Sequence, residues 1–177
     1  MAKYKTVGSH VVSEFPYQLT VFLDRVPEIG EPVYSGKNGW YAQVAIKRRF
    51  KLVAGDESVL VALLENYFSY VPLLNITTLE AQSNDRMPVR FIEVEQSNEL
   101  MTLHDDLMMF LGKKIVSRFP ERDGENYFPH VTAEYEGVDV IDVERYSNRN
   151  FLIKSIALLK DETDSNSILK AEFSLKV

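Results

Sequence analysis

A histidine and a threonine stand two residues apart in the segment FPHVTAEY, residues 128–135. If this segment is a β-strand, Phe128, His130 and Thr132 share one face, because successive side chains of a strand point to opposite sides. A hydroxyl can hold a non-bridging oxygen of a phosphodiester, and an imidazole that titrates near neutral pH can move a proton to or from an attacking or leaving oxygen. His130 and Thr132 are therefore candidate catalytic residues, with Phe128 as a candidate ligand-binding neighbour.

The elements that must position this pair follow from alternation, helix caps and turn residues. The predicted strands are 17–26, 40–50, 74–82, 88–96, 127–136, 151–160 and 169–177. One helix is predicted from Asp56 or Ser58 to about Val71, and a second begins after Ser97 and ends near Gly112. This order of short strands with only two long helices favours an antiparallel α+β protein over a doubly wound parallel sheet.

Composition limits the size of the protein and its partners. The 177 residues contain no repeat, low-complexity tract or Gly/Ser linker, which indicates one domain, 1–177. Acidic residues outnumber basic ones 26 to 20, so a small phosphorylated ligand is a better expectation than duplex DNA. The sequence has no cysteine, no targeting signal and no stretch of about 20 apolar residues. We therefore expect a cytoplasmic protein that does not use a membrane as a partner.

An ordered set of segments places the His-x-Thr pattern in a family context. The segments are PVRFIEV, a helix with LHDDLMMFL, PHVT, and the late strand pair FLIKSIALLKDE and ILKAEFSL. Over about residues 56–177 the chain resembles the two-histidine (2H) phosphoesterases, a LigT-like family that includes 2′-5′ RNA ligase and cyclic phosphodiesterase proteins. The resemblance implies two pseudo-symmetric lobes with the helices outside and a central cleft. It also implies metal-independent catalysis in which each lobe supplies one His-x-Thr/Ser motif, one histidine acting as general base and the other as general acid.

The first of the two motifs is degenerate in this sequence. The aligned stretch is QVAIKRRF, residues 43–50, in which Gln43 stands at the histidine position and Ala45 at the hydroxyl position. A carboxamide cannot exchange a proton near pH 7, and loss of one general acid or base costs about 10²- to 10⁴-fold in rate. Ala45 forfeits a hydrogen bond to a charged oxygen, worth about 1.5–3 kcal/mol. Binding can survive these changes better than turnover can.

The strand around Gln43 also carries aromatic and basic residues. Alternation predicts one face with Tyr41, Gln43, Ala45, Lys47, Arg49 and Lys51. Tyr41 is a candidate to stack on a base or bind a phosphate, and Lys47 is a candidate to attract the anion. Arg90, in MPVRFIEVE, is a candidate for bidentate phosphate binding. The alternatives are that the basic residues only solubilise an edge strand, and that Arg90 forms an ordinary ion pair.

The two other histidines fit the site less well. His10 has no hydroxyl two residues later, and His104 lies on a helix face with Leu100 and Leu111, which favours a structural role. No spaced cluster of metal-ligand residues accompanies LHDD, so neither a metal nor a cofactor is expected.

Two functions remain as hypotheses. The first is a catalytically impaired 2H-like protein that binds a small nucleotide, such as a cyclic mononucleotide, a cyclic oligonucleotide or a 2′-5′ linkage. The second is an active phosphodiesterase that acts on 2′,3′-cyclic or 2′-5′ substrates, including RNA ends. It would use His130 as its only titrating residue, or use His130 with Tyr41, Lys47 or His10 in the other role. A protein-interaction module, in which the cleft has no role, is a third class. The general acid and base requirement favours the first.

Overall fold

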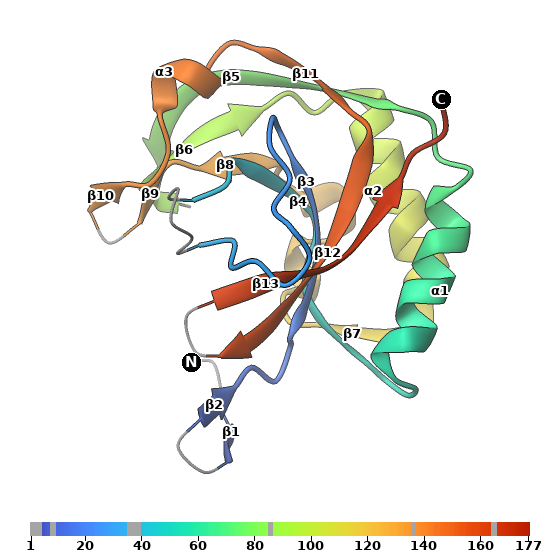
Figure 1. Ribbon diagram of the computed structural model, residues 1–177. Coiled ribbons are helices and arrows are strands. Elements are labelled where there is room, and N and C mark those ends of the chain that lie inside the picture. The colour runs from blue at the N-terminus through green and yellow to red at the C-terminus, as the bar shows by residue number, and fades with distance from the viewer. Residues whose placement is uncertain (1–4, 8–9, 35–39, 85–86, 136, 164–165) are drawn as a thin grey trace.

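The computed structural model describes residues 5–7, 10–34, 40–84, 87–135, 137–163 and 166–177 (Figure 1). The helices are α1 (Glu57–Phe68), α2 (Asn98–Leu111) and α3 (Val143–Tyr146), with short 3-10 turns η1 (Gly112–Lys114), η2 (Pro120–Arg122) and η3 (Gly124–Asn126). The strands are β1 (Lys5–Val7), β2 (His10–Val12), β3 (Tyr17–Phe22), β4 (Gln43–Leu52), β5 (Leu74–Asn84), β6 (Met87–Val94), β7 (Ile115–Ser117), β8 (His130–Thr132), β9 (Glu134–Tyr135), β10 (Val138–Asp139), β11 (Asn150–Ile153), β12 (Ser155–Thr163) and β13 (Asn166–Ser174).

Two antiparallel sheets form the two lobes of the molecule. One has five strands in the order β13-β12-β3-β4-β7, and the other has four in the order β11-β5-β6-β8. The long helices α1 and α2 lie together along one side of the molecule (Figure 1). This arrangement confirms the predicted antiparallel α+β class with two lobes.

One hydrophobic core joins both sheets and both long helices. Its buried residues include Leu19, Val44 and Ile46 of the five-stranded sheet, Ile76 and Ile92 of the four-stranded sheet, Leu64 and Phe68 of α1, and Leu103 and Leu107 of α2. A second, smaller cluster contains Phe22, Val33, Tyr41, Ala157, Leu159 and Leu169. Successive residues 156–159 of β12 alternate between the two clusters, so both faces of this strand are covered. Every residue of its neighbour β3 is buried as well.

The helix ends follow the predicted caps. Asp56 accepts a hydrogen bond from the amide of Val59 at 3.2 Å, and Ser97 accepts one from the amide of Leu100, also at 3.2 Å. The first of the two predicted start points of α1 is therefore confirmed. Gly112 ends α2 with a positive φ of 42°, a conformation that favours glycine.

The predicted strand 151–160 is wrong as a single element. β11 pairs with β5 in the four-stranded sheet, whereas β12 pairs with β3 and β13 in the five-stranded sheet. Only Lys154 separates the two strands. No proline or glycine marks this change of sheet, so no turn signal could have indicated it. The predicted strand 127–136 is likewise shorter, because it divides into β8 and β9.

Candidate functional site

β8 presents His130 and Thr132 on one face, as alternation predicted. It is the edge strand of its sheet, where His130 lies opposite Glu93 and Thr132 opposite Phe91 of β6. Val131, between them, is buried in the core, while His130 and Thr132 are both half-buried. The ring of Phe128 stacks on His130 with centroids 5.7 Å apart and planes 26° apart. Phe128, His130 and Thr132 therefore form the intact side of the candidate site.

The hydrogen bonds of His130 define its tautomer. Nδ1 lies 3.0 Å from the carbonyl oxygen of Phe128, and a carbonyl can only accept, so Nδ1 carries the proton. Nη2 of Arg48 lies 3.1 Å from Nδ1 and 3.0 Å from Nε2, and because Nδ1 is protonated, Nε2 is the nitrogen that accepts from this guanidinium. Burial, reinforced by the positive charge of Arg48, lowers the pKa of His130 to about 4. The imidazole is neutral near pH 7, and its free nitrogen is covered by Arg48.

A bulge in β4 explains why the contacting cation is Arg48. Thr20 of β3 pairs with Ala45, but the preceding residue Leu19 pairs with Lys47, so β4 has one extra residue, Ile46, at this point. Val44, Ile46 and Lys47 are buried, whereas Gln43, Ala45 and Arg48 are half-buried. The bulge therefore replaces Lys47 with Arg48 on the face of Gln43 and Ala45.

Lys47 requires a correction. It is 1% exposed, and its ammonium lies 2.9 Å from the carboxylate of Asp123 and contacts the hydroxyl of Ser117. Burial lowers its pKa, and the hydrogen bond and charge of Asp123 oppose this effect. Lys47 is thus a structural ion-pair residue that ties β4 to the connection between β7 and β8. Its predicted role in attracting an anion is not supported.

Gln43 and Ala45, the residues of the predicted degenerate motif, lie at the start of β4. Gln43 is the first residue of β4, and its Oε1 is buried without a hydrogen-bond partner among the described residues. A ligand hydroxyl can satisfy that atom in either amide orientation, because a hydroxyl both donates and accepts. The carbonyl of Ala45 accepts from the hydroxyl of Tyr127 at 2.9 Å. β4 therefore runs beside the segment that leads into His130.

Tyr41 also requires a correction. It lies before the first residue of β4, is 5% exposed and belongs to the smaller core cluster. Its hydroxyl donates to Glu31, and the guanidinium of Arg25 lies 4.3 Å from the centre of its ring. Burial, followed by the hydrogen bond to Glu31, raises the pKa of Tyr41. These contacts use the ring and the hydroxyl inside the protein, so they do not support a ligand-binding role.

Arg90 forms an ordinary ion pair, which was the alternative to a phosphate contact. Its guanidinium lies 3.4 Å from the carboxylate of Asp139, and both side chains are exposed. Phe91 is paired with Thr132 and therefore lies on the same face of the sheet as His130 and Thr132. Arg90, the residue before Phe91, points to the opposite face. The predicted bidentate phosphate contact is not supported.

The other histidines do not complete the site. His104 is buried and stacks on Tyr127 with centroids 3.9 Å apart. Its Nδ1–H donates to the carbonyl of Ile46, the bulge residue, at 2.8 Å, and its Nε2 accepts from the amide of Gly124 at 3.0 Å. This confirms a structural role. His10 lies in β2, well away from β8 in Figure 1, and its side chain lies outside what the structure describes.

Arg48 and Arg122 are charges of this site that were not predicted from the sequence. Both lower the pKa of His130 in addition to the larger effect of burial, Arg48 more than Arg122. Arg48 could have been found from the pair of arginines in IKRRF, had the bulge been foreseen. The guanidinium of Arg48 contacts a neutral imidazole near a threonine hydroxyl, and this arrangement can hold phosphate oxygens. Arg122 adds positive charge to the site.

Solved structures decide which fold this arrangement belongs to. A crystal structure of a phosphoesterase matches 92% of this chain and 98% of its own, with a TM-score of 0.62 and 13% identity. The crystal structure of E. coli LigT complexed with 3′-AMP also matches 92% of this chain and 98% of its own, with a TM-score of 0.60 and 14% identity. The chain has the LigT fold. TT0787 of Thermus thermophilus is also similar, with a TM-score of 0.58 and 14% identity over 91% of this chain and 98% of that one.

The LigT likeness is one of structure alone. No family model and no curated protein matches the sequence. Other crystal structures with the LigT fold are those of E. coli LigT complexed with ATP, NADP+ and phosphate. Among the described residues of this chain, no three histidine or acidic side chains gather to hold a metal, and no helix is long and apolar enough to span a membrane.

Proposed function

We propose that this chain binds the phosphodiester of a small nucleotide between β4 and β8 and turns it over slowly or not at all. The observation that carries the proposal is the contact between Arg48 Nη2 and His130 Nε2 at 3.0 Å. It brings a cation from the degenerate side onto the nitrogen that a general acid or base would use. The ligand is a cyclic mononucleotide, a cyclic oligonucleotide, or a 2′-5′ or 2′,3′-cyclic phosphate at an RNA end.

The arrangement favours binding over proton transfer. A phosphate oxygen can take the place of Nε2 as the acceptor of Arg48, and a guanidinium to phosphate hydrogen bond is stronger than one to a neutral imidazole. Thr132 can donate its hydroxyl to a second oxygen. Gln43 can bind a ligand hydroxyl through the amide oxygen that has no partner among the described residues. None of Arg48, Thr132 and Gln43 exchanges a proton near neutral pH.

The complexes of E. coli LigT with ATP, 3′-AMP, NADP+ and phosphate support a nucleotide or phosphate as the ligand of this fold. The net charge of −6 supports a small anion over a nucleic acid duplex, because an acidic protein repels a long polyanion.

Calorimetric titration tests the binding proposal. Inorganic phosphate, 3′-AMP, 2′,3′-cyclic AMP and a 2′-5′ adenylate dinucleotide are the probes. We expect saturable binding of at least one of them, weakened about tenfold or more by Arg48→Ala, because a charge-assisted hydrogen bond is lost. Lys113→Ala, which removes an exposed cation on η1, is the matched control and should bind as the unaltered chain does. Absence of binding across the panel rejects the proposal.

Hydrolysis of the phosphodiester is the alternative function, and the tautomer of His130 favours it. The Phe128 carbonyl fixes the Nδ1–H tautomer, which leaves Nε2 as the proton-accepting nitrogen. Under this alternative, 2′,3′-cyclic AMP is hydrolysed and His130→Ala abolishes the product. Equal amounts of product from the unaltered chain and from His130→Ala would exclude it.

Restoring the first motif tests why turnover is slow. We expect Gln43→His combined with Ala45→Thr to raise the rate of hydrolysis of 2′,3′-cyclic AMP by about 10²- to 10⁴-fold, because a second titrating group and a second hydroxyl return. The rate is measured by chromatography of the product, with His130→Ala added to the double variant as the control. A double variant that binds the substrate with unchanged affinity but gains no rate contradicts this account.

A further inference from the structure

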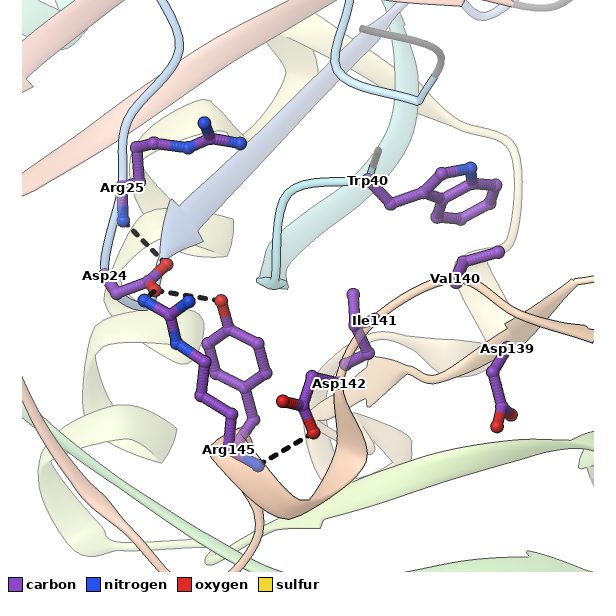
Figure 2. A pocket seen from close by; sticks show the side chains of 9 residues that line it. Asp24, Arg25, Trp40, Asp139, Val140, Ile141, Asp142 and Arg145 are labelled. Atoms are coloured by element: carbon purple, nitrogen blue, oxygen red, sulfur yellow. Dashed lines mark hydrogen bonds and ion pairs between the residues drawn. The ribbon is translucent and has the colours of Figure 1, made fainter. Parts of the chain in front are cut away.

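We propose that a cavity lined by Trp40 and carboxylate side chains is the subsite for the nucleoside part of the ligand. The cavity has a volume of about 440 Å³, and its lining includes Asp24, Arg25, Trp40, Asp139, Asp142 and Arg145 (Figure 2). This inference rests on the proposed function for the phosphate, but it concerns different residues. The ligand class is a nucleotide whose base carries an exocyclic amino group.

The cavity lies between the two lobes. Asp24, Arg25 and Trp40 come from the loops that flank β3 and β4, whereas Asp142 and Arg145 come from α3 and its N-cap. Asp24 Oδ2 accepts from the guanidinium of Arg145 at 2.6 Å and from the hydroxyl of Tyr146 at 2.8 Å, which closes one end (Figure 2). The volume falls in the range of about 300–1,000 Å³ that is typical of small-molecule sites.

Trp40 connects the cavity to the phosphate site. It precedes Gln43 by three residues, a reach of about 10 Å along extended chain. Its ring lies against Tyr34, with centroids 4.7 Å apart, and against Tyr135 at 5.3 Å. These three rings thus form an aromatic row at the cavity, and the indole of Trp40 is a stacking surface for a base.

The charges of the cavity select which part of the ligand enters. Asp142 uses Oδ1 to cap α3, accepting from the amides of Glu144 at 3.1 Å and Arg145 at 3.3 Å. Asp142 lines the cavity, and its other oxygen can accept a further hydrogen bond. Carboxylates repel a phosphate but accept from a base amino group or a sugar hydroxyl. Asp24 and Asp139 are paired with Arg145 and Arg90, and Arg25 also lines the cavity, so Asp142 is the carboxylate that can select the base. Asp142 and the cationic site at Arg48 therefore orient the nucleotide with its base at Trp40 and its phosphate at His130.

The fluorescence of Trp40, the chain's one tryptophan, reports directly on this subsite. Adenosine and 3′-AMP should change the Trp40 fluorescence saturably. Inorganic phosphate should leave the fluorescence unchanged even at concentrations where calorimetry detects its binding. 3′-UMP, which lacks the amino group, should bind about tenfold more weakly than 3′-AMP. Adenosine binding should persist in Arg48→Ala, because adenosine carries no phosphate.

Two variants separate the subsite from the phosphate site. Asp142→Asn keeps a residue that can cap α3 but removes the charge, and should weaken adenosine and 3′-AMP about tenfold without altering inorganic phosphate. Trp40→Leu should do the same in calorimetry, with Tyr70→Leu, an exposed aromatic on another surface, as the control. The inference is overturned if adenosine does not bind and 3′-AMP binds no more tightly than inorganic phosphate, a result that leaves the phosphate site standing. If inorganic phosphate does not bind but adenosine does, the proposed phosphate site is rejected and the nucleoside subsite stands.

Discussion

At the scale of single residues, the charge state of His130 distinguishes this site from an acid and base pair. The imidazole is half-buried, its Nδ1–H is committed to the Phe128 carbonyl, and its Nε2 accepts from a cation. Burial removes solvation and Arg48 repels a second positive charge, and together they outweigh the Phe128 carbonyl, which favours the imidazolium form. His130 is thereby suited to accept a hydrogen bond at neutral pH and poorly suited to donate a proton.

The depressed pKa of His130 predicts how stability depends on pH. Well above pH 6.5 the imidazole is neutral in both the folded and the unfolded chain, so it has no effect on the free energy of unfolding. As the pH falls from 6.5 to about 4, the unfolded chain binds a proton that the folded chain does not, and the free energy of unfolding decreases. At about 1.4 kcal/mol per unit of pKa difference, the decrease amounts to roughly 3 kcal/mol.

Urea unfolding at a series of pH values, compared between the unaltered chain and His130→Gln, measures this effect. The variant should lose less stability between pH 6.5 and about 4 than the unaltered chain does. Burial also lowers the pKa of His104, but that residue is present in both proteins and cancels in the comparison. Parallel stability curves would mean that His130 is protonated as readily in the folded chain as in the unfolded one.

At the scale of elements, the bulge in β4 selects the cation of the site. The extra residue Ile46 is held by His104 of α2 through its carbonyl, so the bulge is fixed by a contact between a helix and a strand. Lys47 is directed to Asp123 and Ser117, and Arg48 to His130. One insertion in the ladder thus separates a structural ion pair from a candidate ligand contact.

Lys47→Met tests the structural role of this pair. Removing one partner leaves the carboxylate of Asp123, with a side chain 14% exposed, without its cation. We expect the free energy of unfolding to decrease by about 3–5 kcal/mol, as measured by urea denaturation. Adding Asp123→Leu should recover part of the loss, because it removes the unpaired charge. A loss below about 0.5 kcal/mol in the single variant, which is typical of surface substitutions, would show that the pair is not stabilising.

At the scale of the whole molecule, both lobes depend on one core. Buried side chains of the two sheets and of α1 and α2 form a single cluster. Asp24, just after β3, adds a polar tie to Arg145 and Tyr146 of α3. Burial and the contact with Asp24 raise the pKa of Tyr146 to about 12. The lobes are therefore joined by the shared hydrophobic core and by the hydrogen bonds of Asp24 at the cavity beside Trp40.

The shared core predicts that the chain unfolds in one cooperative transition. Neither sheet can lose its packing without exposing apolar surface of the other, so an intermediate with one folded lobe is disfavoured. Trp40 fluorescence reports on the junction of the lobes, and far-ultraviolet circular dichroism reports on the whole backbone. The two signals should give coincident midpoints in urea. Separated midpoints would identify two independently stable lobes.

The sequence by itself determined the class of the fold, both long helices with their caps, and the face of β8 that carries Phe128, His130 and Thr132. These features depend on local periodicity and on cap residues such as Asp56 and Ser97, which neighbouring residues in the chain specify. The assignment of Gln43 and Ala45 to a degenerate first motif stays a prediction.

Only the tertiary structure decided which cation meets His130 and where Tyr41 and Lys47 lie. Alternation assumes an unbroken ladder, but a bulge depends on the partner strand and on His104, which is 58 residues away from Ile46. The change of sheet at Lys154 and the cavity beside Trp40 likewise arise from contacts between segments far apart in the chain. Packing between such segments, rather than the order of residues within one of them, sets the charge and the shape of the candidate site.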